Sequence, residues 1–412
     1  MKFFILLSVF LSALAACGQD GAARFEALFE RVDTNRDGKV SKEELGAAGQ
    51  RSAWLEKADR NGDALVDRDE LRRFFQRPEP GAQEKKTVAI EVVQSHPPEG
   101  EAPVTMEGIR AAEIYSADRE GHSFLVMIDG KTVHESYANG WDRMAGHRLA
   151  SGTKSFSGAL LALAVKDGLL SLDEAVSATI TGWKPDDRLR TITIRQLLNL
   201  TSGIEPGANG KVPSYAEATE VAALSGAGEA FRYGPNAFQI FGELLKRKLE
   251  AHEQVAPGDP LAYLEARVFD RIGLKYTRWR RDDDGNPHLP SGAFLTAPEW
   301  AKFGQLLLQK GEWDGEVLLN PETLAEAVRP QNDTTPEYGL TFWLLESGVD
   351  ESRPWMKGSY MAAGAGKQRL FVLPAVGMVI VRQGESRKFE NIEFLEALFS
   401  VDSSVAFVQD GE

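Results

Sequence analysis

The sequence predicts an α+β fold for the larger, C-terminal part of the chain, built on an antiparallel sheet, with a small all-α module before it. Three observations predict this arrangement. Residues 123–137, SFLVMIDGKTVHESY, form a hairpin pattern of two strands around an Asp129-Gly130 turn. Residues 369–384, RLFVLPAVGMVIVRQG, give two more short strands. Helical segments separate these strand pairs, so the sheet joins distant parts of the chain.

The N-terminal stretch MKFFILLSVFLSALAAC has one lysine, an apolar centre and a small-residue exit, which predicts a secretory signal peptide over residues 1–16. The segment from Leu14 to Gly18, LAACG, resembles the lipobox of bacterial lipoproteins. The resemblance implies cleavage before Cys17, lipid on its sulfur, and attachment to the membrane of the bacterial cell envelope. Gly18 suits the outer membrane in a Gram-negative host. The alternative is a plain signal peptide.

Composition limits the partners of the chain. The formal net charge of −14 argues against a nucleic-acid partner, which requires basic patches. Cys17 is the only cysteine of the 412 residues, so an exported chain has no disulfide and depends on core burial and bound ions.

Two twelve-residue stretches, 33–44 (DTNRDGKVSKEE) and 59–70 (DRNGDALVDRDE), share the spacing of calcium-binding loops. Such loops place side-chain oxygens at positions one, three and five, a backbone carbonyl at seven and a bidentate carboxylate at twelve. Gly38 stands at the sharp turn of the first loop, and Ala64 takes that place in the second. The predicted ligands are Asp33, Asn35, Asp37, the Lys39 carbonyl and Glu44, then Asp59, Asn61, Asp63, the Leu65 carbonyl and Glu70.

Amphipathic segments flank both loops, and Val40 and Val66 occupy the matching positions at which paired loops make a short strand contact. We therefore predict an EF-hand pair over residues 17–77 that binds Ca²⁺, with a structural role favoured over a signalling one. Proline, glycine and charged residues then predict a linker over residues 78–105, with a short strand-like TVAIEVV inside it.

The stretch 148–168, RLASGTKSFSGALLALAVKDG, places Ser151 and Lys154 just before a long apolar run. A helix starting at Ser151 presents free N–H groups and its positive dipole end to the serine oxygen. A desolvated lysine one turn along can hold a lowered pKa and accept the hydroxyl proton. The alternative is that the serine caps the helix and the lysine reaches solvent.

Several further segments bear on this choice. The region beginning LASGTKSFSGALLALAVKDGLLSLDE resembles the serine β-lactamase, penicillin-binding and esterase superfamily, particularly its class C-like branch. The other matching segments are TITIRQLLNLTSGI, FRYGPNAFQIFGELL, LTAPEWAKFGQLLLQKGEW and AAGAGKQRLFVLP, in the family's order. The resemblance spans residues 106–400, with residues 401–412 as a C-terminal tail. It implies a β-lactamase-like antiparallel sheet flanked by helices, with an inserted helical subdomain.

Residue by residue, the resemblance implies that Ser151 is acylated, that Lys154 is its partner and that Tyr233 relays protons. Because a tyrosine ionises far above neutral pH, we expect Lys154 to lower the pKa of Tyr233. The family's tyrosine is often followed two residues on by asparagine. Here that place is Pro235, and Asn236, the candidate substrate-binding residue, comes one later.

The third motif departs from the β-lactam-binding branches, which have Lys or His, then Thr or Ser, then Gly. This chain has Ala362-Ala363-Gly364. Gly364 permits close backbone approach to a substrate, and the N–H of Ala365 is the expected oxyanion donor beside that of Ser151. Lys367 or Arg369 are candidate replacements for the missing cation that holds a substrate carboxylate. The departure favours ester or small amide hydrolysis over penicillin hydrolysis.

The sequence therefore predicts a lipid-anchored extracytoplasmic serine hydrolase that acts on a small ester, amide or peptide without a catalytic cofactor. Two alternatives stay open. One is a non-catalytic module that binds cell-wall peptide or a partner protein, and the other is a D-alanyl-D-alanine carboxypeptidase or β-lactamase.

Overall fold

The computed structural model describes residues 29, 32–41, 44, 65–68, 88–97, 103–252, 258–345 and 353–400. They belong to two compact units, Met1–Thr87 and Val88–Glu412. The predictions for the signal peptide, Cys17, most of the second calcium loop (Asp59, Asn61, Asp63 and Glu70) and the C-terminal tail lie outside the described residues.

In the N-terminal unit, the described residues include the strand contact expected between the two loops. Strand β1 (Lys39–Val40) pairs antiparallel with β2 (Val66–Asp67), and Val40 lies opposite Val66. Both valines are buried. Gly38 has φ +83°, a backbone conformation that glycine adopts without strain. The contact predicted from Val40 and Val66 is confirmed.

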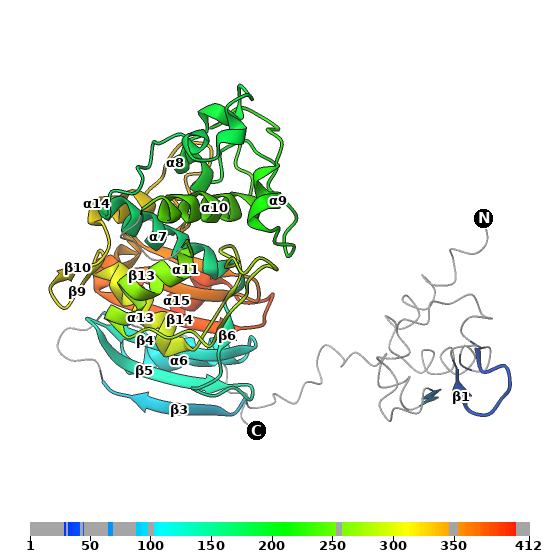
Figure 1. The fold of residues 1–412 in the computed structure, drawn as a ribbon. Coiled ribbons are helices and arrows are strands. Elements are labelled where there is room, and N and C mark those ends of the chain that lie inside the picture. The colour runs from blue at the N-terminus through cyan, green and yellow to red at the C-terminus, as the bar shows by residue number, and fades with distance from the viewer. Residues whose placement is uncertain are drawn as a thin grey trace. The chain divides into compact units, whose positions relative to one another are not determined.

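The larger unit is built on a seven-stranded antiparallel sheet in the order β11-β12-β13-β14-β4-β5-β3 (Figure 1). Its strands are β3 (Ile90–Ser95), β4 (Gly121–Ile128), β5 (Lys131–Ala138), β11 (Trp343–Leu344), β12 (Tyr360–Gly364), β13 (Gln368–Leu373) and β14 (Met378–Gly384). The C-terminal strand β14 pairs with β4, so the sheet joins distant parts of the chain as predicted.

Both predicted hairpins form. Asp129 and Gly130, between β4 and β5, have φ +47° and +79°, the signs that a two-residue hairpin turn requires. The strand-like segment expected inside the linker does form a strand: residues 90–95 are the edge strand β3, paired with β5. The β-branched residues of IEVVQS favour this pairing.

Alternating side chains bury both faces of the sheet. Phe124, Val126 and Phe371 belong to one hydrophobic cluster, with helices α6 (Met106–Ala117) and α15 (Asn391–Phe399). The neighbouring residues Leu125, Leu370 and Val379 belong to a second cluster, which includes α13 (Ala297–Leu308). The sheet is therefore the middle layer between helices.

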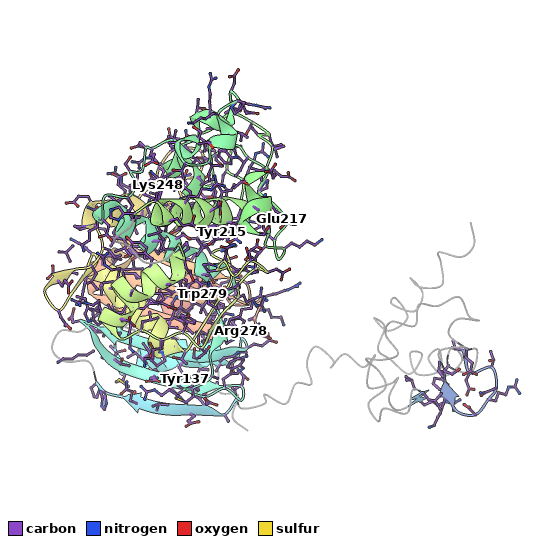
Figure 2. All side chains as sticks on the ribbon, in the orientation of Figure 1. Tyr137, Tyr215, Glu217, Lys248, Arg278 and Trp279 are labelled. Atoms are coloured by element: carbon purple, nitrogen blue, oxygen red, sulfur yellow. The ribbon has the colours of Figure 1, made fainter. Side chains whose placement is uncertain are left out.

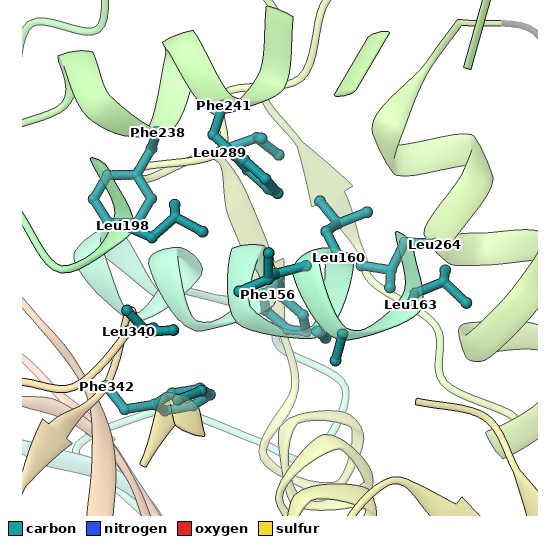
Figure 3. Packing of buried hydrophobic residues seen from close by; sticks show 14 of the residues in the cluster. Phe156, Leu160, Leu163, Leu198, Phe238, Phe241, Leu264, Leu289, Leu340 and Phe342 are labelled. Carbon is teal, nitrogen blue, oxygen red and sulfur yellow. The ribbon is translucent and has the colours of Figure 1, made fainter. Parts of the chain in front are cut away.

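Helix α7 (Ser155–Lys166) lies in the second cluster and is buried on all sides from Ser155 to Ala164. Phe156, Leu160 and Leu163 on this helix pack among leucines and phenylalanines from other helices and loops (Figure 3). Such surroundings fix the helix, and they fix the turn that precedes it.

Further helices complete the unit, and those between residues 190 and 250 lie in the upper part of Figure 1. They include α8 (Ile194–Leu198), α9 (Tyr215–Thr219), α10 (Asn236–Glu250), α11 (Pro260–Leu264), the π-helix η6 (Glu265–Phe269), α12 (Asp270–Ile272) and α14 (Pro321–Ala327). Short 3₁₀ turns are η2 (Ala150–Lys154), η3 (Val176–Ala178), η4 (Thr181–Trp183), η5 (Leu189–Thr191), η7 (Pro354–Met356) and η8 (Pro374–Val376).

Two small sheets complete the unit: β6 (His147–Arg148), β8 (Ala293–Leu295) and β7 (Arg278–Trp279) in one, and β9 (Glu312–Trp313) with β10 (Glu316–Val317) in the other. Among the described residues, no helix has the length and apolarity needed to cross a bilayer.

Candidate active site

Ser151 lies in the turn η2, directly before the buried helix α7. Ala150 has φ +47°, a left-handed conformation that costs a non-glycine residue about 1 kcal/mol. The hydroxyl of Thr153 holds the turn, because it donates to the Ala150 carbonyl at 2.7 Å and accepts from the Ala293 N–H at 3.2 Å. The serine oxygen is thus placed by a turn that its surroundings constrain.

Lys154 is buried at 4% exposure with its amine beside the nucleophile. Its Nζ lies 3.1 Å from Ser151 Oγ and 3.1 Å from the Pro290 carbonyl oxygen. Burial lowers the pKa of Lys154 to about 7, because a low-dielectric environment disfavours the charged amine. Near neutral pH a large fraction of the amine is therefore unprotonated and able to accept the Ser151 proton.

Tyr233 borders the same amine, which lies 4.8 Å from the centre of its ring. Burial raises the pKa of Tyr233, while a hydrogen bond with Ser151 and the positive charge of Arg369 partly oppose the rise. The expectation that Lys154 lowers the pKa of this phenol is not met. Tyr233 is therefore a neutral hydroxyl near pH 7, and Lys154 is the better-placed base.

Strand β12 approaches the nucleophile turn so closely that only glycine fits at its end. A Cβ on Gly364 would lie 2.0 Å from the Leu149 carbonyl oxygen and 3.0 Å from the Gly152 nitrogen. This contact places Gly364 and Ala365 at the edge of the space that faces Ser151. The arrangement suits the predicted pair of oxyanion donors, the N–H groups of Ser151 and Ala365.

These residues open into one cavity of about 570 Å³, a size that accommodates a small ligand. Trp343 forms part of its wall and packs against Tyr233 with ring centres 5.9 Å apart. The lining residues are Arg148, Ala150, Ser151, Lys154, Asn209, Gly210, Val212, Tyr233, Pro235, Pro290, Ser291, Trp343, Met361, Ala363, Gly364, Ala365 and Arg369.

Two candidate substrate-binding residues do not line this cavity. The side-chain amide of Asn236 donates to the Glu205 carbonyl at 2.9 Å, so it ties the start of α10 to a loop. Lys367 sits at the β12–β13 turn with φ +61° and lies 3.4 Å from a Glu390 carboxylate oxygen. The structure thus places both side chains in structural contacts away from the cavity lining.

Arg369 does line the cavity. Its Nε donates to Asn391 at 2.7 Å, and its Nη1 donates to the carbonyls of Gly364 and Gln368. Burial lowers the pKa of Arg369 to about 10. The guanidinium therefore supports the end of β12 while it adds positive charge to the cavity.

Sequence reasoning missed the Pro290 carbonyl, the loop residues Asn209, Gly210 and Val212, and the cavity role of Arg148. A backbone carbonyl has no signature in the sequence. Arg148 is the first residue of the RLASGTK stretch, two residues before the strained turn. Its proximity to Ser151 in the sequence could have indicated that it lines the cavity.

The first calcium loop holds its oxygens against its own backbone. Asp33 accepts the N–H groups of Asp37 and Gly38, and Glu44 accepts those of Asn35 and Ser41. Burial favours the neutral form of Glu44, but these hydrogen bonds outweigh it and lower its pKa to about 2. Within the described residues, no group of three or more acidic, histidine or cysteine side chains has metal-binding spacing. The hard oxygen donors still suit Ca²⁺ chemically.

An antiparallel sheet between helices, with a Ser-x-x-Lys turn at the start of a buried helix, defines the class of serine hydrolases with a β-lactamase-like fold. A family model described as Beta-lactamase matches residues 105–387, and a model described as EF hand matches residues 25–47 and 52–75. The chain belongs to the beta-lactamase family and carries an EF-hand pair at its N-terminus.

The relatives compared with this chain are distant. An uncharacterised protein of Alkalihalophilus pseudofirmus is 24% identical over 306 residues, which cover 64% of this chain and 84% of that protein. EstCE1, described as a hydrolase with promiscuous acyltransferase activity, has a TM-score of 0.58 at 16% identity and covers 71% of this chain and 99% of its own. A D-stereospecific amidohydrolase from Streptomyces gives 0.54 at 17% identity, with coverages of 71% and 99%. At these identities the structural likeness concerns the fold alone.

Proposed function

We propose that the protein hydrolyses an ester or small amide through an acyl-enzyme on Ser151. The observation that carries the proposal is the buried amine of Lys154, 3.1 Å from Ser151 Oγ in a cavity, with a pKa of about 7. A lysine with only a structural role would be more stable with its amine in solvent, since burying an unpaired amine costs free energy. This geometry is that of a nucleophile with an adjacent base.

In the proposed reaction, the neutral amine of Lys154 takes the hydroxyl proton as Ser151 Oγ bonds to the acyl carbon. The carbonyl electron pair moves to oxygen, whose charge the N–H groups of Ser151 and Ala365 stabilise. The intermediate then collapses and the bond to the leaving group breaks. Lys154, with the Tyr233 hydroxyl as relay, returns the proton to that group. Water repeats the sequence on the acyl-enzyme and releases the acid.

The third motif favours esters or small amides over β-lactams. Ala362 and Ala363 stand where the β-lactam-binding branches have a cation and a hydroxyl. Structural neighbours include a hydrolase with acyltransferase activity, an amidohydrolase and a putative beta-lactamase, so the choice rests on this motif.

The test is a fluorophosphonate probe applied to the full chain, followed by peptide mass analysis. We expect one adduct, on Ser151, and protection by a short 4-nitrophenyl ester. An unlabelled Ser151 in folded protein, with ester turnover equal to that of Ser151→Ala, would contradict the proposal and favour a non-catalytic binding module.

The N-terminal unit is proposed to bind Ca²⁺ through Asp33, Asn35, Asp37, the Lys39 carbonyl and Glu44, with a second ion in the second loop. The match to EF hand models and the Val40–Val66 contact support this. Calorimetric titration with Ca²⁺ checks it: Glu44→Gln should weaken one of two sites by at least tenfold, because it removes the bidentate carboxylate. Equal binding by the variant would contradict the assignment.

Lipid on Cys17 and a place in the bacterial cell envelope complete the proposal, supported by the lipobox-like LAACG. Metabolic labelling with a palmitate analogue should mark the wild-type chain and not Cys17→Ser. A label retained by the variant would exclude this anchor.

A further inference from the structure

The cavity is basic although the chain is acidic. Three of its described lining residues, Arg148, Lys154 and Arg369, are basic, and none of the seventeen is Asp or Glu. The chain as a whole has a formal net charge of −14. A site with this sign inside a protein of the opposite sign attracts anions selectively.

The positive charge continues outside the cavity on the small sheet β6-β8-β7. Arg148 on β6 and Arg278 on β7 both lie opposite Phe294 of the central strand β8. Residues directly opposite in neighbouring strands share a face, and so do residues two apart along a strand. Arg148, Arg278 and Arg280 therefore emerge on one face, while Trp279 between them is buried (Figure 2 labels Arg278 and Trp279).

The aromatic ring at the centre of this face brings the guanidinium groups together. The Arg278 and Arg280 guanidinium carbons lie 5.7 and 5.3 Å from the centre of the Phe294 ring. Partial burial and the nearby charges of Arg148 and Arg278 lower the pKa of Arg280, because both disfavour its positive charge. We call Arg148, Arg278 and Arg280 the arginine face.

No carboxylate neutralises this face within the described part of the chain. None of the three arginines forms a salt bridge there, whereas the neighbouring Arg281 pairs with Asp259 at 2.8 Å. Clustered cations cost free energy in the absence of a counter-charge. Because Arg148 belongs both to this face and to the cavity lining, the arginine face borders the cavity that contains Ser151.

We propose that the arginine face is the binding site for an anionic group of the substrate, a carboxylate or a phosphate next to the ester or amide that Ser151 attacks. The inference rests on the proposed hydrolase function and specifies its substrate class. Guanidinium groups suit both oxyanions, since they donate paired hydrogen bonds to either.

Matched ester pairs test it. One pair carries the charge on the acyl side: 4-nitrophenyl hydrogen glutarate and its methyl ester. Two other esters, 4-acetoxybenzoate and 4-acetoxyphenyl phosphate, carry the negative charge on the leaving group, and each has a neutral, methyl-esterified partner. Comparing these two anions distinguishes a site for carboxylate from a site for phosphate. Each kcat/KM is divided by the rate with hydroxide to remove intrinsic reactivity. We expect the wild-type chain to prefer the anion of at least one pair by about tenfold at low salt, and less at 0.5 M salt, where screening is strong.

The double variant Arg278→Gln/Arg280→Gln and the single variant Arg148→Gln should each lower this anion-to-neutral ratio severalfold. The neutral ester reports folding in each variant. Arg190→Gln/Arg329→Gln removes two exposed charges away from the cavity and should leave the ratio unchanged.

A wild type that turns over neutral and anionic esters equally overturns the inference while the hydrolase proposal stands. A preference for the anionic ester that persists in all the arginine variants also overturns the inference. The same holds if the double variant keeps the anion-to-neutral ratio but loses binding to vesicles of anionic lipid. Turnover no greater than that of Ser151→Ala overturns the hydrolase proposal instead.

Discussion

Among the described residues of the larger unit, two buried clusters place a serine hydroxyl beside a lysine amine or a histidine ring, and only one of them has the setting of an active site. In the first, Lys154 Nζ lies 3.1 Å from Ser151 Oγ. In the second, His134 lies between Ser95 Oγ at 3.1 Å and a Glu113 carboxylate oxygen at 3.1 Å, the residue types of a catalytic triad. His134 and Glu113 are 3% and 2% exposed.

The difference lies in what surrounds each cluster. Ser151 faces a cavity of about 570 Å³, whereas the space beside Glu113 is about 10 Å³, room for one water. The second cluster also satisfies its own polar groups, because Glu113 accepts from His134 and pairs with Arg110. Lys154 has no acidic partner within salt-bridge distance among the described residues. Reactivity therefore follows from an unpaired base and an open cavity, and residue types alone do not reveal it.

Replacing each serine gives the largest expected contrast. Ser151→Ala should abolish ester turnover, a loss of roughly 10⁶ in kcat for a nucleophile. Ser95→Ala should leave kcat within about twofold, because Ser95 faces no substrate space. Initial rates with a neutral 4-nitrophenyl ester measure both. Turnover lost in Ser95→Ala and kept in Ser151→Ala would reverse the assignment of the two clusters.

Replacing the base of each cluster has the second-largest expected effect. Lys154→Met should lower the acylation rate about 10³-fold, the usual contribution of a positioned base. It should not destabilise the fold, because it removes an unpaired amine from the interior. His134→Gln should do the opposite, lowering stability with little effect on acylation. Burst kinetics and urea unfolding of each variant separate the two outcomes.

The pH dependence of kcat/KM reports the same base. Because burial lowers the pKa of Lys154 to about 7, the amine is protonated below neutral pH and cannot accept the serine proton. We expect kcat/KM for a neutral ester to rise with pH through about 7 and to be roughly 50-fold lower at pH 5 than at pH 7. A flat profile over this range, in protein shown to stay folded, would exclude Lys154 as the base.

The fold could be predicted where local patterns determine it. The hairpin around Asp129-Gly130 and the strand pair around Pro374 each combine short apolar runs with local turn residues. The strand-like TVAIEVV inside the linker was recognisable from its β-branched residues. Its pairing was not, because local composition does not show that residues 90–95 pair with β5 at the edge of the sheet. Edge pairing is a tertiary property.

The residues of the site divide in the same way, into those that local spacing predicts and those that it does not. Ser151 and Lys154 share one turn, so their contact follows from helical spacing. Tyr233 and Ala365 came from a resemblance to a family, and the Pro290 carbonyl had no signal at all. Asn236 does not line the cavity, because it stands one position later than the family's asparagine. At the start of a helix, that shift directs its side chain to the Glu205 carbonyl. Spacing predicts contacts within an element; contacts between elements require the fold.

The smallest expected effect concerns the closed cluster. Burial favours the neutral form of Glu113, but hydrogen bonds from His134 and Ser136 outweigh it, so the pKa of Glu113 is lowered on folding. Its contribution to stability is therefore present above the unfolded pKa, about 4.5, and is lost as pH falls through the lower folded value. Glu113→Gln should cost about 1–3 kcal/mol of unfolding free energy at pH 7, the cost of weakening a buried network.

Urea unfolding at pH 7 and below pH 4 measures this dependence, with the exposed Glu312→Gln as control. The difference between wild type and Glu113→Gln should shrink at the lower pH, because the wild-type carboxylate is then partly protonated. Ester turnover at pH 7 should be unchanged in folded Glu113→Gln. A loss of turnover without a loss of stability would show that this second cluster acts on the reaction, and the contrast between the two clusters would fail.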